Sequence, residues 1–379
     1  MTESSANHSK KDPGPGITSD PQSLVYASQW RLMWVKFKEH RLAAVGLWVL
    51  AVFYGLALAA PFLAPYDPWQ GSDLIDAPPT RIRLIHQGRW MRPFVYGVRM
   101  KVDPSTFDRT ILTDSSTVRP VRLFPAGFQY RWLGIVKSRR HLFGADPGAA
   151  IHLLGTDMLG RDCFSRNLCA LQISLTVGMF GVVITFVLAC LIGGLSGYYG
   201  GIVDNLLQRF MEIVTCIPTI PMWMALSAAI PSDWGNVKVY FAITVILALR
   251  SWTGLSRQIR SKLLQLREED FVVAAKVAGT SDWKIITIHL LPGFMSFLIV
   301  SLTLEIPKMI LGETSLSFLG LGLRPPTVSL GVLLQDAQNL AAVSAYPWLM
   351  FPALAVILAV LAFNFVGDGL RDAADPYRE

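Results

Sequence analysis

The stretch LQISLTVGMFGVVITFVLACLIGGL, residues 171–195, contains no charged side chain. A helix that crosses a lipid bilayer needs about 20 predominantly apolar residues. The stretch therefore predicts a membrane-spanning helix, and comparable apolar blocks recur along the chain. That recurrence predicts an all-α fold that crosses the membrane several times.

The composition supports the same class. The chain has 379 residues, of which 52% are hydrophobic and only 16% charged, and its mean hydropathy is +0.41. Soluble domains carry roughly 25% charged residues, so the polar surface is too sparse for a large water-soluble protein. In a membrane protein, a net charge of +7 usually reflects Lys and Arg in cytoplasmic loops or near anionic lipid headgroups. No aromatic–basic RNA motif or zinc spacing accompanies it, so nucleic acid is not an expected partner.

Six stretches are long and apolar enough to span the membrane. The third carries Pro218 and Pro221 and the fifth carries Pro307, and we expect kinks there, which membrane helices tolerate when neighbours satisfy the freed backbone groups. The predicted spans are 42–64, 171–195, 205–230, 239–258, 293–312 and 346–367.

Orientation follows from Lys and Arg in the short loops, which are enriched on the cytoplasmic side. The segments before the first span, between the fourth and fifth and after the sixth are rich in these residues, whereas the short loops opposite hold only Lys238 and Arg324. Both termini are therefore predicted to be cytoplasmic. Residues 1–24 are polar and rich in Ser, Pro and Gly, which predicts a disordered cytoplasmic tail.

Residues 25–65 combine a basic amphipathic helix with the first span. Trp30, Met33, Trp34 and Phe37 recur at helical spacing, with basic side chains on the other faces. Such a helix lies in the membrane interface. The alternative is a cap that packs on the following helix.

Residues 66–150 are predicted to form a small extracytoplasmic insert between the first and second spans. The loop from 66 to 170 carries 15 Lys and Arg against nine Asp, but loops longer than about 60 residues translocate largely regardless of charge. Short β-like pieces at 92–102 and 118–136 suggest a folded subdomain. Its basic character either attracts an acidic partner or only solvates the surface.

Catalytic chemistry has little support in the sequence. The stretch GGLSG (193–197) contains the G-x-S-G pattern of intramembrane serine proteases, but such a serine needs a neighbouring base, and all six histidines lie outside the predicted spans. An intramembrane protease is therefore a remote alternative. No H-E-x-x-H metal motif and no P-loop for ATP phosphates occurs. We expect no catalytic residue, metal or cofactor. If this protein moves a solute uphill, another chain must supply the energy.

The segment VVAAKVAGTSDWKIITIHLLP (272–292) stands out because it is too polar to span the membrane. It resembles the EAA loop of ABC importer permeases, with Ala274, Ala275, Gly279, Leu291 and Pro292 in place. Val273 stands where that motif has glutamate.

Four further motifs resemble the dipeptide, oligopeptide and nickel branch of that family, in particular its C-type oligopeptide permease subunit. They follow one another in the family's order. The matching stretches are LLGTDMLGRDCFSR (153–166), SGYYGGIVDNLLQRFMEI (196–213), LGETSLSFLGLGLRPP (311–326) and FNFVGDGLRDAADP (363–376).

The resemblance implies a type I ABC importer fold, with residues 151–379 as the core domain holding five spans and the coupling loop at 268–292. It implies that this loop docks in a groove of a cytoplasmic ATPase, where ATP and Mg²⁺ bind, and the alternative is a helix packed on its own chain. The small residues would permit close approach, and Ser281 or Asp282 would cap the second piece. The implied coupling residues are Ala274, Ala275, Gly279, Thr280, Ser281, Asp282 and Trp283.

The resemblance also implies a bacterial inner-membrane complex. Its other members would be a second homologous permease subunit, two ATPase subunits and an extracytoplasmic substrate-binding protein, all in contact with membrane lipid. The cargo would be di- or oligopeptides, with oligosaccharides or another small solute as the alternative. Candidate translocation-path residues are Pro218, Pro221, Trp223, Glu305 and Lys308. For the last two, a structural ion pair is an equally open interpretation.

Overall fold

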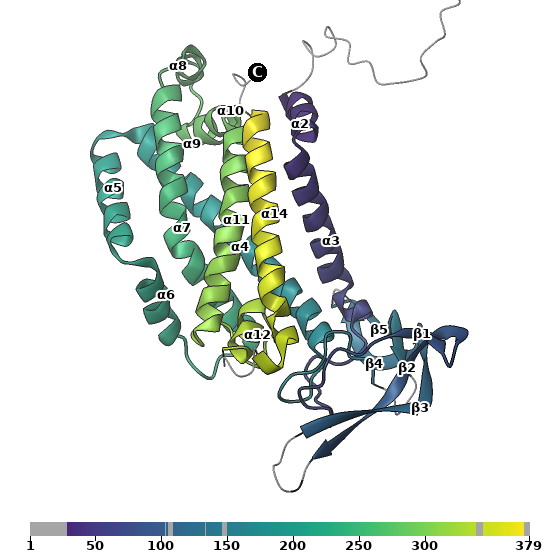
Figure 1. Ribbon diagram of the computed structural model, residues 1–379. Helices are drawn as coiled ribbons and strands as arrows, with labels where there is room; N and C mark the ends of the chain where they lie inside the picture. Colours follow the sequence, from purple (N-terminus) through teal and green to yellow (C-terminus); the bar gives the residue numbers. More distant parts are fainter. Residues whose placement is uncertain are drawn as a thin grey trace, which may run out of the picture.

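The computed structural model describes residues 29–102, 104, 109–132, 134–145, 150–338 and 344–374. The predicted tail at 1–24 lies outside these residues. The described part consists of a bundle of long helices with a β-rich unit at one end (Figure 1).

Five helices are long and apolar enough to cross a membrane, or six spans result if one bent pair is counted as a single span. The helices extend beyond most predicted spans because their polar end turns leave the hydrocarbon region, which alone must be apolar. The five are α3 (Arg41–Leu63), α4 (Cys163–Tyr199), α7 (Asn236–Leu266), α11 (Met295–Phe318) and α14 (Phe351–Ala374), the last preceded by a 3₁₀ turn (Pro347–Met350).

Helices α4 and α7 form the most extensive helix pair. Two glycines of α4 permit this contact: a Cβ atom on Gly193 would lie 2.5 Å from the Ser256 carbonyl oxygen, and one on Gly197 would lie 2.8 Å from that of Arg260. Small residues let helix backbones approach closely in membranes. The glycines of the GGLSG stretch therefore serve packing, and Ser196 within it donates a hydrogen bond to Asp204.

The third predicted span is not one kinked helix, which corrects that expectation. Helices α5 (Gly201–Cys216) and α6 (Thr219–Ala228) meet at an angle of 84°. The cause is local: Ile217, which precedes Pro218, is extended, as pre-proline sterics favour. Pro221 lies in the first turn of α6, where no backbone donor is needed. The pair is a broken span or a re-entrant loop.

Helix α2 (Gln29–Glu39) is the predicted amphipathic helix. Met33 and Phe37 are buried in the cluster that also holds Phe363 and Val366 of α14, so this face packs on the chain's own helices, as the alternative interpretation held. Trp34 is 51% exposed on another face, with the Lys38 ammonium above its ring. An interfacial position of that face stays a prediction.

The β-rich unit contains two antiparallel sheets. Strands β2 and β4 coincide with the predicted β-like pieces, whereas β1, β6 and most of β3 and β5 lie outside them. The larger sheet has the strand order β1-β2-β3-β6 and the smaller one pairs β4 with β5. Phe94 and Val95 are buried on the larger sheet. The strands are β1 (Arg83–His86), β2 (Arg89–Val102), β3 (Arg109–Leu123), β4 (Ala126–Trp132), β5 (Val136–Arg140) and β6 (Phe143–Ala145).

Candidate functional site

The segment that follows α7 forms a protrusion at the end of the bundle opposite the sheets (Figure 1). It begins with α8 (Asp270–Val277), turns, and continues through the one-turn α9 (Asp282–Lys284), a π-helical stretch (Ile285–Leu290) and α10 (Leu291–Gly293). All seven predicted coupling residues lie in this protrusion, and we call it the coupling segment.

Gly279 makes the turn possible. Its φ of +75° is a left-handed conformation that glycine adopts without steric cost. The amide of Gly279 donates to the Lys276 carbonyl and that of Thr280 to the Ala275 carbonyl, which is a Schellman helix end. A Cβ atom here would meet nothing within 4 Å, so the glycine serves the backbone and not a close contact within this chain.

The expected side-chain cap on the second piece is wrong. Ser281 occupies the N-cap position of α9, but its side chain makes no capping hydrogen bond. The Asp282 carboxylate instead accepts hydrogen bonds from the hydroxyls of Tyr198, at 2.6 Å, and Tyr199, at 3.2 Å. Both tyrosines lie at the end of α4, and their hydroxyls, not the backbone amides of α9, donate to the carboxylate. The carboxylate thus holds the turn to α4.

A second link holds α4, α5 and α7 together beside the coupling segment. The Arg260 guanidinium of α7 donates from Nε and Nη2 to the two oxygens of Asp204 on α5, both at 2.5 Å. Ser196 of α4 donates to the same carboxylate. Bidentate Arg–carboxylate pairs fix geometry as well as charge. The SGYYGG-x-x-D motif therefore contributes contacts to both the coupling turn and this junction.

The coupling segment has a buried side and an exposed side. Val272, Ile285, Ile286 and Leu290 are buried in one cluster with residues of α4 and α7. The other side exposes apolar surface, including Val277 at 85% and Trp283 at 56%. Ala274, Gly279 and Asp282 are also exposed, whereas Ala275 and Thr280 are partly covered. Exposed apolar surface of this kind is typical of a docking site.

The candidate path residues lie elsewhere. Pro218 and Pro221 mark the α5–α6 bend, and Trp223 of α6 packs against α11, where a Cβ atom on Gly312 would lie 2.9 Å from its ring. On the same helix, the Lys308 ammonium lies 2.6 Å from Glu305 Oε1. The Lys308 side chain is 66% exposed and that of Glu305 17%, so the pair forms with its carboxylate largely covered and its ammonium at the surface of this chain.

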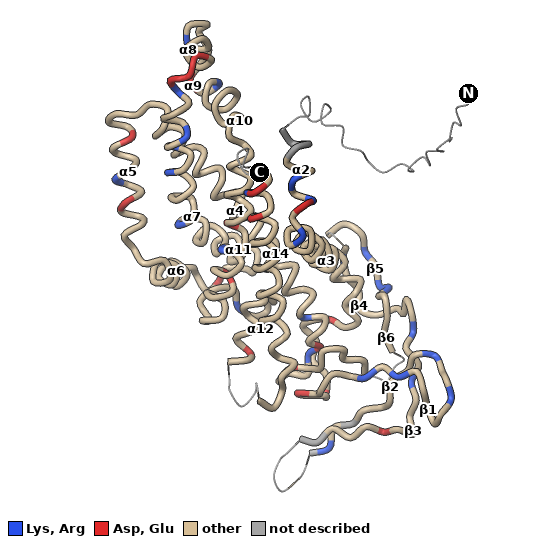
Figure 2. Tube along the Cα trace, turned by 45° about the horizontal axis from the view of Figure 1, so that its top comes forward, with Lys and Arg blue, Asp and Glu red and all other residues tan. Residues whose placement is uncertain are grey.

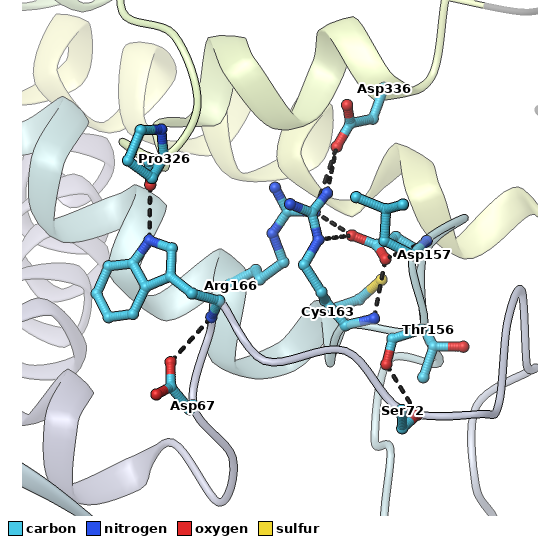
Figure 3. Close-up of polar contacts among 12 residues, drawn as sticks. Asp67, Ser72, Thr156, Asp157, Cys163, Arg166, Pro326 and Asp336 are labelled. Carbon is cyan, nitrogen blue, oxygen red and sulfur yellow. Dashed lines mark hydrogen bonds and ion pairs between the residues drawn. The ribbon is translucent and has the colours of Figure 1, made fainter.

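Sequence reasoning missed a polar cluster at the start of α4 (Figure 3). Arg166 is 2% exposed and bonds Asp157 and Asp336, and Arg161 donates to Asp157. The 153–166 motif supplies most of this cluster, but nothing local marks Asp336 of α12 (Leu330–Asp336). Burial raises the pKa of Asp336, and the two arginines oppose that shift.

A buried carboxylate forms the second cluster that was missed. Glu313 of α11 is fully buried and accepts hydrogen bonds from Ser174 of α4 and Ser317, at 2.9 and 2.8 Å. Ser174 also accepts from the Leu330 amide of α12. The cluster links three helices. The ETSLS stretch (313–317) contains Glu313 and Ser317, but nothing in the sequence places Ser174 beside them. Among the described side chains, no group of three His, Cys, Asp or Glu is placed to hold a metal ion.

Comparison with known proteins gives a consistent result. The family described as binding-protein-dependent transport system inner membrane component matches residues 174–378, and the N-terminal TM domain of oligopeptide transport permease C matches 28–79. A dipeptide transport system permease protein of Lactococcus lactis is 30% identical over 350 residues, covering 90% of this chain and 89% of that protein.

Two further comparisons cover less of the chain. An oligopeptide transport system permease protein of Bacillus subtilis is 34% identical over 241 residues, covering 63% of this chain and 76% of that protein. Among solved structures, an inward-facing MetNI methionine ABC transporter chain is 18% identical, with a TM-score of 0.41, covering 55% of this chain and 94% of that one. Likeness at that level leaves the fold to be argued from the chain's own helices.

Proposed function

The chain belongs to the family of binding-protein-dependent transport inner membrane components, and we propose that it is one permease subunit of an ATP-driven importer of di- or oligopeptides. The named relatives transport dipeptides and oligopeptides, which favours peptide over oligosaccharide cargo. In the protease alternative, Ser196 would be the nucleophile, but its hydroxyl donates to Asp204, a carboxylate that Arg260 also binds.

In this proposal the coupling segment docks on a cytoplasmic ATPase, which hydrolyses ATP for this chain. The observation that carries it is the exposed apolar side of the segment, with Val277 at 85% and Trp283 at 56% exposed. Tyr198 connects the segment to α4, and the segment follows directly on α7 in the chain, so a displacement of the docked segment would move these long helices. The remaining partners would be a second homologous permease subunit, a second ATPase and an extracytoplasmic binding protein.

The proposed topology has six spans in a type I importer arrangement, with α5 and α6 together as the third. Both termini and the coupling segment would be cytoplasmic, which places the β-rich insert at 66–150 outside. The core domain would comprise 151–379, with Pro218, Pro221, Trp223, Glu305 and Lys308 along the path. The Lys and Arg distribution supports this orientation.

Val277→Glu tests the docking proposal because Val277 is 85% exposed and so contributes little packing within its own chain. We expect the variant to insert and fold normally but to lose co-purification with the ATPase subunits and peptide uptake. The matched control is the same substitution at Val237, which is 70% exposed and lies at the start of α7, the end far from the coupling segment. In Val237→Glu, ATPase co-purification should persist. Unchanged ATPase association in Val277→Glu would show that the segment does not dock there.

A further inference from the structure

The β4–β5 hairpin is the part of the insert that lies beside a membrane-spanning helix. In Figure 1 it adjoins the end of α3. The Trp132 indole nitrogen donates a hydrogen bond to the Leu58 carbonyl oxygen of α3 at 2.8 Å, and Phe124, just before β4, stacks on Phe62 with ring centroids 6.3 Å apart. These contacts fix the hairpin against the helix.

The contact with Leu58 also sets the depth of the hairpin. Leu58 lies five residues before Leu63, the last residue of α3. At 1.5 Å per residue, the Trp132 indole is about 7 Å inside the end of that helix. Leu58 itself is 51% exposed on an apolar helix. The hairpin therefore lies at the level of the spanning helix and not beyond it.

At this level the hairpin exposes apolar side chains. Ile135 in its turn is 82% exposed, Val136 is 56% and Trp132 is 42%. Leu123, the last residue of β3, and Phe124, which follows it, are 72% and 55% exposed. We refer to these five residues as the hairpin apolar patch. Because the patch continues the apolar surface of α3, the medium that covers that surface covers the patch as well.

The charges around the patch are of one sign. Arg131, Lys137, Arg139 and Arg140 flank the turn and are exposed, and the sequence from 124 to 141 contains no Asp or Glu. Figure 2 shows basic positions on β5, near α3. Apolar side chains with cations at their edge, and a Trp near the helix end, are typical of protein surfaces that bind anionic lipid.

We propose that the β4–β5 hairpin is a lipid-binding element, whose apolar patch inserts into the leaflet where α3 ends and whose four cations contact anionic phospholipid headgroups. The hairpin thereby anchors the insert to the bilayer surface and orients the larger sheet relative to the helices. This inference requires only that α3 spans the membrane. It is independent of the cargo and of ATPase docking, so either can fail without the other.

The test uses the complete chain, co-expressed with its companion subunits, in nanodiscs of equal parts phosphatidylglycerol and phosphatidylcholine. A photoreactive benzoylphenylalanine replaces Ile135, and in a matched protein it replaces Leu112, which is 52% exposed near the start of β3. That end of the sheet points away from the helices (Figure 1). After illumination, mass spectrometry identifies what each position has captured.

We expect phospholipid adducts at position 135 and none at position 112, with phosphatidylglycerol adducts exceeding phosphatidylcholine adducts. In the combined Lys137→Gln and Arg139→Gln variant this excess should be lost, leaving adducts in the mixing ratio. Capture of a companion subunit at position 135 would overturn the proposal in favour of a protein interface. Absence of lipid adducts at 135, or equal lipid adducts at 112, would also overturn it. An unchanged excess in the double variant would overturn the role of the cations.

Discussion

The hydroxyl of Tyr198 donates a hydrogen bond to Oδ1 of Asp282 at 2.6 Å, although the two residues are 84 positions apart in the chain. The bond joins the end of α4 to the second half of the coupling segment. The Lys276 ammonium of α8 lies over the same tyrosine ring, 5.1 Å from its centroid. One side chain thus contacts both halves of the proposed ATPase-docking element.

Tyr198→Phe should loosen the coupling segment without unfolding the bundle. The ring of Tyr198, which is 7% exposed, keeps its packing, and only the hydrogen bond of its hydroxyl is lost. The loss of one such hydrogen bond typically lowers the free energy of unfolding by about 1 kcal/mol. We expect ATPase association to persist and ATP hydrolysis to become less dependent on substrate, measured as the ratio of stimulated to basal activity. Tyr199→Phe is the control, because its bond to Asp282 is longer, at 3.2 Å. An identical ratio in wild type and Tyr198→Phe would remove Tyr198 from the coupling mechanism.

Gly279 should tolerate asparagine better than alanine. Both side chains have space, since a Cβ atom meets nothing within 4 Å, but the φ of +75° costs a non-glycine residue about 1–3 kcal/mol, and asparagine least. We expect Gly279→Ala to reduce ATPase co-purification more than Gly279→Asn. Equal loss in both would point to the surface itself, and not the turn conformation, as the reason for glycine.

Arg166 should be needed for stability at the start of α4. Its side chain is 2% exposed and lies between the carboxylates of Asp157 and Asp336 (Figure 3). Removing one partner of a buried ion pair typically costs about 3–5 kcal/mol. We therefore expect Arg166→Gln to lower the unfolding temperature in detergent.

The control for Arg166 is a double-mutant cycle with Asp336→Asn. Since the two residues are bonded, the second change should cost less in the Arg166→Gln background than alone. Additive losses would mean that Asp336 acts independently of Arg166.

Lys308→Gln should show whether the Glu305–Lys308 pair lines the translocation path or only stabilises the fold. The Lys308 ammonium is 66% exposed and so remains largely solvated, and ion pairs with a solvated partner typically contribute only about 0–1 kcal/mol to stability. If the pair lines the path, peptide uptake in proteoliposomes should fall while the unfolding temperature changes little. A large fall in unfolding temperature, restored by Glu305→Gln in the same chain, would instead assign the pair to stability.

The positions of the membrane-spanning segments were determined by the sequence itself. Apolar length is a local property. Helices α4 and α7 contain their predicted spans, and α3, α11 and α14 overlap theirs to within one to five residues at one end. Strands β2 and β4 and the helix end at Gly279 are also local, because β-branched alternation and a left-handed turn depend on few neighbouring residues. The proposed coupling segment stands out in the sequence for the same reason: its polar turn interrupts an apolar chain.

Only the tertiary structure decided how distant residues meet. Arg166 pairs with Asp336 across 170 positions, and Tyr198 replaces an expected local cap by taking Asp282. The burial of Met33 and Phe37 against α14 and the 84° bend between α5 and α6 depend on which surface each helix finds. Apolarity and short-range backbone sterics are encoded residue by residue. The pairing of a buried charge, however, is decided by the helices that pack around it.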